Sequence, residues 1–170
     1  MQIASVMSSE RGRTDRVLAE VAAVLLAQGL RVAGVVQTNI EKPGRSHCDM
    51  DVKVLPDGPV IRINQELGTS ARGCRLDPGA LETAVAQVEA TLAGEIDILI
   101  VNKFGKHEGE GRGFRTLIAD AVARGIPVVT GVNELNRLAF EDFSAGLAMP
   151  LAADTAEILG WCRADRISAR

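Results

Sequence analysis

The run of residues 98–101, Ile-Leu-Ile-Val, most strongly constrains the fold, because every position is apolar and no polar residue interrupts it before Asn102. The segment "IPVVTGV", residues 126–132, predicts a second buried strand. Strands that are apolar on both faces are typical of parallel sheets covered by helices on each side. Aromatic residues make up only 3% of the 170-residue chain, so Val, Leu, Ile and Ala must fill this core.

Predicted strands and helices alternate along the chain. Residues 2–7 and 31–37 are predicted strands, and residues 13–29 between them place apolar side chains at helical spacing, with Gly29 ending the helix. A strand, a helix and a strand in so short a span indicate parallel pairing with a right-handed crossover. Four more helices are expected, over residues 77–95 with Asp77 as N-cap, 111–125, 133–146, and 154–166 with Asp154 as N-cap.

A small antiparallel excursion is expected between about residues 38 and 64. Two alternating runs flank Pro56-Asp57-Gly58 there, and a turn of this kind between alternating runs is a hairpin signal. The fold predicted is therefore α/β: a doubly wound, mostly parallel sheet flanked by helices, with an inserted β-hairpin. Residues 1–170 are expected to form this single domain.

Composition and charge exclude several classes of function. The formal net charge of −3 provides no basic field for nucleic acid, and few aromatic side chains are available to stack on bases. The N-terminal apolar stretch is too short for a signal peptide, and no run reaches membrane-spanning length. We expect a cytoplasmic protein without membrane insertion. Its three cysteines are expected to be reduced and, lacking a C-x-x-C pair, to form no metal site.

The turn after the first predicted strand is "MSSERGRT", residues 7–14. Ligands of such sheets bind at the carboxyl ends of the strands, so this turn is the first candidate site. A phosphate-binding loop has the pattern G-x-x-x-x-G-K-[S/T], and here Met7 replaces the first glycine. The candidate anion-binding residues of this turn are Ser8, Ser9, Gly12, Arg13 and Thr14, of which the last three take the G-K-[S/T] places.

Three arginines, Arg11, Arg13 and Arg16, lie at the start of the first predicted helix. A helix N-terminus carries a positive partial charge, so cations there are mildly unfavourable and an anionic ligand would compensate for them. The alternative is an ordinary strand-to-helix turn with arginines on the surface.

A second cation-rich turn, "NKFGKHEGEGRGFR", follows the apolar run and contains four glycines. Carboxyl ends of parallel strands meet at one edge of a sheet, so the two turns are expected to form a common anion pocket of amides and cations. The alternative is a solvated loop in which Glu108 and Glu110 neutralise the cations. The candidate anion-binding residues here are Asn102, Lys103, Lys106, Arg112 and Arg115, with Arg72 and Arg75 from "ARGCRLD" completing the pocket.

The same turn bears on catalysis. Nucleotide hydrolysis needs a metal ion, usually held by an acid at the end of this strand. Asn102 occupies that position, and Lys103 beside it would repel magnesium. Glu108 is the one nearby acid that can orient a water or hold a cation, so it is the catalytic candidate if the chain hydrolyses nucleotides. Magnesium is a cofactor only in that case.

Several motifs resemble known families. "RVAGVVQ" followed by the hairpin and by "DILIVNKFGKHEGEGRGFR" is similar to the small P-loop nucleoside-triphosphatase family known from thermophiles, which has an acidic "DEIG" in place of "NKFG". "CDMDV", "ARGCRLDPGAL" and "NKFGKHEGEGRGFR" more closely resemble an uncharacterised bacterial family of unknown function associated with molybdenum-transport genes. The resemblance implies a P-loop-NTPase-like fold, and its link to molybdenum points to molybdate, a tetrahedral dianion of phosphate-like shape.

The leading hypothesis is a cytosolic protein that binds an oxyanion, either molybdate or a nucleotide phosphate, and acts in molybdenum handling or regulation. The alternative is a divergent magnesium-dependent nucleoside triphosphatase. A third hypothesis is a domain that binds a protein partner through the edge of the pocket. A homodimer also stays open, because Trp161 and Cys162 on the last predicted helix are either core or dimer contacts.

Overall fold

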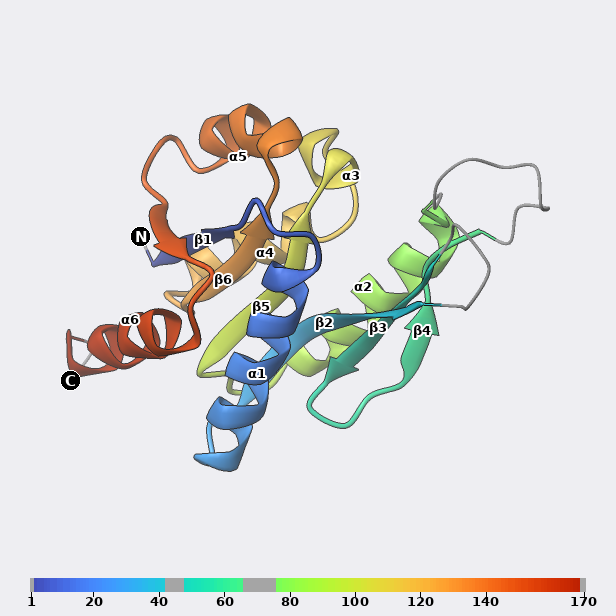
Figure 1. The fold of residues 1–170 in the computed structure, drawn as a ribbon. Coiled ribbons are helices and arrows are strands. Elements are labelled where there is room, and N and C mark those ends of the chain that lie inside the picture. Colours follow the sequence, from blue (N-terminus) through green and yellow to red (C-terminus); the bar gives the residue numbers. More distant parts are fainter. Residues whose placement is uncertain (1, 42–47, 66–75, 169–170) are drawn as a thin grey trace.

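The computed structural model describes residues 2–41, 48–65 and 76–168 (Figure 1). Its strands are β1 (Ile3–Met7), β2 (Val32–Glu41), β3 (Cys48–Leu55), β4 (Val60–Arg62), β5 (Ile98–Phe104), β6 (Val128–Val132) and β7 (Met149–Ala152). Within these ranges they form one sheet in the order β4-β3-β2-β5-β6-β1-β7. The strands from β2 to β7 in this order pair in parallel, whereas β3 and β4 extend the sheet beyond β2 by antiparallel pairing.

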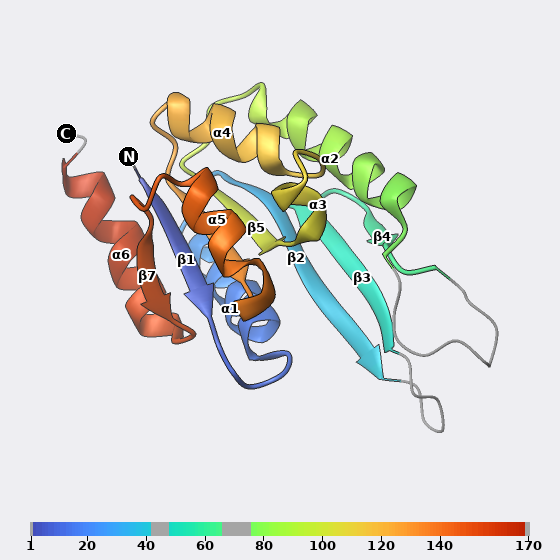
Figure 2. The ribbon, with the colours of Figure 1, turned by 90° about the horizontal axis from the view of Figure 1, so that it is seen from above.

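Helices cover both faces of this sheet (Figure 2). They are α1 (Arg13–Ala27), α2 (Pro78–Leu92), α3 (Lys106–Gly109), α4 (Arg115–Ala123), α5 (Arg137–Phe143), α6 (Thr155–Ser168) and the short 3-10 helix η1 (Glu134–Asn136). α1 and α6 bury apolar side chains against one face, and α2, α4 and α5 bury theirs against the other. This arrangement confirms the predicted doubly wound α/β fold. Among the described helices, none combines the length and hydrophobicity that crossing a bilayer requires.

The apolar run in β5 contributes to both faces of the sheet. Ile98 and Ile100 belong to the cluster under α1 and α6, whereas Leu99 and Val101 belong to the cluster under α2 and α4. All four side chains are buried, because successive residues of a strand point to opposite faces and both faces are covered here. The lack of polar alternation in the sequence is therefore a direct consequence of the position of β5 inside the sheet.

The predicted starts of α1, α2 and α6 are confirmed, whereas their ends differ from the prediction by two or three residues. The Asp77 carboxylate caps α2 by accepting hydrogen bonds from the backbone N–H groups of Gly79 at 2.9 Å and Ala80 at 3.1 Å. The Asp154 carboxylate caps α6 by accepting from the next turn of that helix at 2.9 Å. Gly29 follows α1 with a φ of +79°, the left-handed conformation that ends many helices.

β2 is longer than the sequence predicts. The hairpin around Pro56-Asp57-Gly58 is confirmed as the connection between β3 and β4, but β2 continues through Glu41 instead of ending at Gln37. Residues 34–41 of β2 pair with residues 48–55 of β3. This antiparallel ladder satisfies the backbone of a polar segment whose side chains show no apolar alternation, so the sequence pattern does not reveal it.

Three further elements differ from the prediction. The sequence does not predict β7, because Pro150 lies within it and proline is tolerated only at a sheet edge, where β7 pairs with β1 alone. The helix expected over residues 111–125 begins at Arg115, since Gly111 and Gly113 adopt φ values of +88° and +58° that an α-helix does not use. The helix expected over residues 133–146 begins as η1 and continues as α5.

A substitution of Gly34 tests the close contact between β2 and β5. It has a φ of +118°, and a Cβ at this position would lie 1.8 Å from the carbonyl oxygen of Ile100. Gly34→Ala is therefore expected to lower the free energy of unfolding by about 3 kcal/mol, measured by urea denaturation followed by circular dichroism. Gly160→Ala in α6 is the control, because a Cβ there meets no atom within 4 Å. Equal stability of Gly34→Ala and the parent protein would contradict this packing.

Candidate functional site

A cavity of about 170 Å³ lies at the carboxyl edge of the sheet, where β1, β5 and β6 end. We call it the loop cavity. β6 lies between β1 and β5, so the turn after β1 and the end of β5 face each other across the end of β6. The side chains and backbone that line it come from the β1–α1 turn (Ser8, Ser9, Glu10, Arg11, Gly12), the start of α1 (Thr14, Asp15), the end of β5 (Asn102, Lys103) and the end of β6 (Gly131, Val132, Asn133).

Gly12 gives the β1–α1 turn the shape of a loop that closes onto a helix. It is the N-cap of α1 and has a φ of +73° and a ψ of −4°, a left-handed conformation that costs glycine little. The Arg13 N–H donates back to the Glu10 carbonyl at 3.3 Å, and the Arg16 N–H donates to the Gly12 carbonyl at 3.1 Å. The glycine of the partial phosphate-binding pattern is thus required by its backbone conformation.

Gly131 in β6 allows α1 and β5 to approach each other. A Cβ at this position would lie 2.3 Å from the carbonyl oxygen of Asn102 and 2.9 Å from Cγ2 of Thr14. Only a residue without a side chain fits at this distance. Thr14 and Asn102, which are far apart in the sequence, therefore reach the same cavity.

Asn102 is buried, with 3% of its surface exposed, and its carboxamide joins three elements. Its Oδ1 accepts a hydrogen bond from the backbone N–H of Gln37 in β2 at 3.0 Å. Its Nδ2 donates to Oδ1 of Asp15 in α1 at 2.9 Å and to Oε1 of Gln37 at 3.5 Å. The side chain at the end of β5 thus fixes α1 and β2 relative to β5, a task that requires both a donor and an acceptor.

Arg13 is not among the residues that line the loop cavity. Its Nε donates to the Ala153 carbonyl at 3.0 Å, and its Nη1 lies 3.3 Å from a carboxylate oxygen of Glu10. Arg16 pairs with the other oxygen of Glu10 at 2.5 Å. The Arg16 and Arg13 guanidinium groups hold the pKa of Glu10 below its ordinary value. Arg13 and Arg16 at the helix start are therefore paired with a local carboxylate.

Glu108, the catalytic candidate, has a buried carboxylate that organises the turn after β5. Its Oε2 accepts from the N–H of Gly105 at 2.9 Å, and its Oε1 accepts from the N–H of Phe114 at 3.1 Å. Only 3% of the residue is exposed. Gly113 is required beside it, because a Cβ there would lie 2.1 Å from Oε1 of Glu108. This geometry supports a structural role that the sequence does not indicate.

The other cations of this turn lie outside the loop cavity. Lys106 and Arg112 both pair with Glu110, Lys106 at 3.7 Å, and Arg112 holds the pKa of Glu110 below its ordinary value. The Arg115 guanidinium lies 4.6 Å from the centre of the Phe143 ring and donates to the Glu108 carbonyl at 3.1 Å. These contacts agree with the alternative prediction, a loop whose cations are neutralised or packed by neighbouring side chains of the protein itself. Arg72 and Arg75 lie outside the described residues.

Lys103 differs from these cations. It is exposed, it lines the loop cavity, and within the described parts of the chain its ammonium group makes no hydrogen bond or ion pair. It also borders a second, apolar cavity of about 350 Å³ on the side of β2, β3 and α2. Lys103 is therefore the cation at the junction of two cavities.

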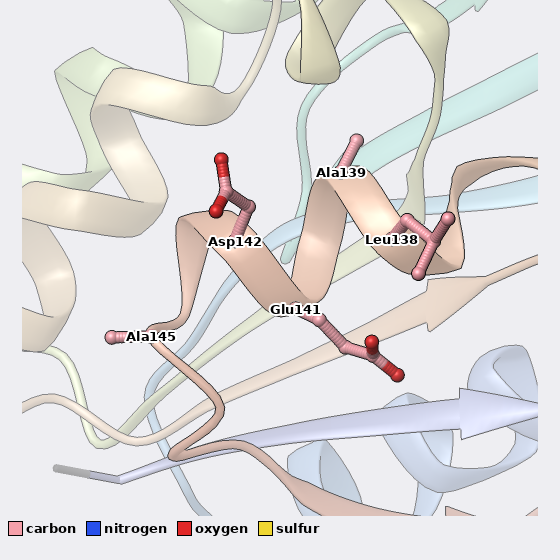
Figure 3. A pocket seen from close by; sticks show the side chains of 5 residues that line it. All are labelled: Leu138, Ala139, Glu141, Asp142 and Ala145. Carbon is pink, nitrogen blue, oxygen red and sulfur yellow. The ribbon is translucent and has the colours of Figure 1, made fainter.

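A larger open hollow of about 770 Å³ lies over α5 (Figure 3). Two acidic residues, Glu141 and Asp142, line it, and Glu141 pairs with Arg137 at 2.6 Å. None of its described lining residues is a cation, and none belongs to the predicted anion pocket. Its size therefore does not make it the candidate site.

Residues 3–161 match the family described as "Protein of unknown function (DUF2478)". The chain belongs to this family. It is also 35% identical, over 162 residues, to the molybdenum import ATP-binding protein ModC 2 of Bradyrhizobium diazoefficiens. That match covers 95% of this chain but only 18% of the relative's length.

The fold is similar to that of a human cancer-related nucleoside triphosphatase solved in solution, with a TM-score of 0.62, 16% identity, and coverage of 99% of this chain and 97% of that chain. The predicted P-loop-NTPase-like fold is confirmed by this match. The predicted resemblance to a family of unknown function is confirmed by the family match. Its molybdenum association stays a prediction.

The residues predicted for the site do not include several that line the loop cavity, namely Glu10, Arg11, Asp15, Gly131 and Asn133. They also do not include Gln37, which is hydrogen-bonded to Asn102. The Asn102 amide donates a hydrogen bond to Asp15, 87 positions away in the sequence. Neither motif contains a local pattern that indicates this contact. Gly131 has a weak signal, since a glycine inside a predicted buried strand often marks a close approach of another backbone.

The Asn102 network can be tested by making it acidic. Asn102→Asp is expected to lower the free energy of unfolding by about 2 kcal/mol at neutral pH, because two carboxylates would then face each other. Repulsion raises the pKa of the variant's carboxyl pair in the folded state above the ordinary value. The loss is therefore complete above that raised pKa, shrinks as the pH falls through it, and is gone below the ordinary carboxyl pKa of about 4. Urea denaturation across this pH range is the measurement.

The matched control for this experiment is the exchanged pair, Asn102→Asp with Asp15→Asn. It restores one donor and one acceptor across the 2.9 Å contact. At least half of the lost stability should return at neutral pH. A single Asn102→Asp variant as stable as the parent protein at every pH would contradict the proposed network.

Proposed function

We propose that the chain binds a nucleotide through its phosphate groups in the loop cavity, with Lys103 as the principal cation. The observation that carries this proposal is the Lys103 ammonium group, which lines the loop cavity together with the N-terminus of α1. Among the described residues it forms no hydrogen bond or ion pair. A helix N-terminus and a lysine together favour phosphate. The left-handed Gly12 and the hydroxyl groups of Ser9 and Thr14 support the same ligand.

Molybdate is the second candidate for the same cavity. The relative from Bradyrhizobium diazoefficiens is named as a molybdenum import ATP-binding protein, and this name supports both ATP and a role in molybdenum handling or its regulation. Molybdate is a tetrahedral dianion and needs the same donors as a phosphate group. We place this activity in the cytoplasm, where both ligands are available.

We further propose that binding is not followed by fast hydrolysis. Asn102 takes the position of a metal-binding acid, and its amide is bonded to the carboxylate of Asp15. The Glu108 carboxylate is buried and each of its oxygens accepts from a backbone N–H group, which favours a structural role over orienting a water. Lys103 would repel magnesium at the same edge. A divergent magnesium-dependent nucleoside triphosphatase, with Thr14 near the metal, remains the alternative function.

Lys103→Ala tests the ligand and its position. The affinity for ATP, GTP or molybdate, measured by isothermal titration calorimetry, is expected to fall by about tenfold or more, because a charge-assisted contact is lost. Lys53→Ala is the control, since it removes the same charge from β3, where Nζ donates to the Gly58 carbonyl at 2.6 Å. Its affinity should match that of the parent protein.

Equal weakening by both substitutions would show a general charge effect and contradict a site at Lys103. Absence of heat with all three ligands would contradict the proposed function itself. Phosphate release in the presence of magnesium, measured on the same samples, separates binding from hydrolysis: rapid release by the parent protein that is lost in Glu108→Gln would favour the alternative function.

A further inference from the structure

The apolar cavity beyond Lys103 takes no part in the proposed phosphate site. Its floor is the sheet, with Val35 of β2, Val52 of β3 and Val101 of β5, and its roof includes Leu81 of α2 and Phe114. All five side chains are buried. Its volume of about 350 Å³ lies in the range of small-molecule pockets. A core normally closes such apolar space, because unfilled volume costs stability.

The polar groups of this cavity lie at one end of it, beyond the carboxyl ends of β5 and β6. They include the Lys103 ammonium, the His107 imidazole and the Asn133 carboxamide, together with Lys106 and Asn136. Oδ1 of Asn133 already accepts from the N–H of Asn136 at 3.1 Å and from its Nδ2 at 2.7 Å. Within the described residues, no hydrogen bond engages the Asn133 amide nitrogen, the Lys103 ammonium or the His107 ring.

The remaining polar groups of the cavity are satisfied and need no ligand. Gln37 and Asn102 are hydrogen-bonded to each other, and the Glu108 carboxylate accepts from two backbone N–H groups. Lys106 pairs with Glu110 at 3.7 Å, and the Asn136 amide donates to Asn133. A ligand therefore meets an apolar slot between a sheet and a helix layer, with donors only at its mouth. A flat ring fills such a slot, and a polar or anionic substituent on the ring reaches the donors.

We propose that the apolar cavity binds a planar ring that carries a polar or anionic group, with the ring between the sheet and α2 and the polar group beside Lys103. The ring belongs either to the nucleotide bound in the loop cavity or to a second molecule, and the two sources differ in the experiment below. The proposal does not depend on phosphate binding, because the ring contacts are separate from the loop cavity.

The probe is anilinonaphthalene sulfonate, an aromatic body with an anionic group whose fluorescence rises in apolar surroundings. Met50, a partly buried residue, lines the cavity, so Met50→Trp is expected to fill it and weaken probe binding by about tenfold. Met149→Trp is the matched control, because Met149 is 52% exposed on β7 at the far edge of the sheet. Leu76→Trp, at another wall of the cavity, is the second filling variant, and thermal unfolding checks that each protein is folded.

Loss of probe affinity in the folded Met50→Trp or Leu76→Trp variant, with none in Met149→Trp, is the expected result.

Titrations of the same variants with ATP and with inorganic tripolyphosphate identify the source of the ring. Weaker ATP binding with unchanged tripolyphosphate binding assigns the cavity to the nucleotide's own base, and unchanged binding of both assigns it to a second molecule. No probe binding by the parent protein, or equal binding by all folded variants, would overturn the proposal. Probe binding without any phosphate binding would retain this inference and refute the proposed function.

Discussion

The candidate site depends on the hydrogen bonds made by the carboxamide of Asn102. A buried amide must find both donors and acceptors, and this one finds the backbone of β2, the side chain of Gln37 and the carboxylate of Asp15. β5, β2 and α1 are thereby fixed relative to one another, and two of them, β5 and α1, line the loop cavity. Gly131 permits the arrangement, because any side chain there would separate Thr14 from the end of β5.

This constraint also decides where positive charge is available. Asn102 points into the protein, and the next residue of β5, Lys103, is exposed between the loop cavity and the apolar cavity. Three other described cations near the site are held outside the cavity: Arg13 by Glu10 and a backbone carbonyl, Arg112 by Glu110, and Arg115 by the Phe143 ring. Arg11 lines the loop cavity together with Lys103. The end of β5 thus carries an amide, Asn102, where metal-dependent hydrolysis usually needs an acid, and a lysine beside it.

The sequence predicts the layers of this fold well, because burial on both faces leaves a clear mark on β5 and on the periodic helices. It also predicts the N-cap at Asp77 and the hairpin turn at Pro56, because capping and turn formation depend on the residues at those positions. It does not predict β7 or the extension of β2, whose stability comes from pairing with distant strands. Within the site, the pattern identifies Gly12, Thr14 and Lys103, but it treats every nearby arginine as available for a ligand. Whether Arg112 faces a ligand or Glu110 is a matter of side-chain geometry that spacing alone does not determine.

The most direct test of the central claim is an amide chemical-shift titration of the isotope-labelled protein with ATP. If phosphate groups occupy the loop cavity beside Lys103, the largest changes occur at Gly12, Thr14 and Lys103, and the amide of Arg112 changes little. Changes confined to the turn around Arg112, or no change at Gly12 and Lys103 at saturating ATP, would contradict the account.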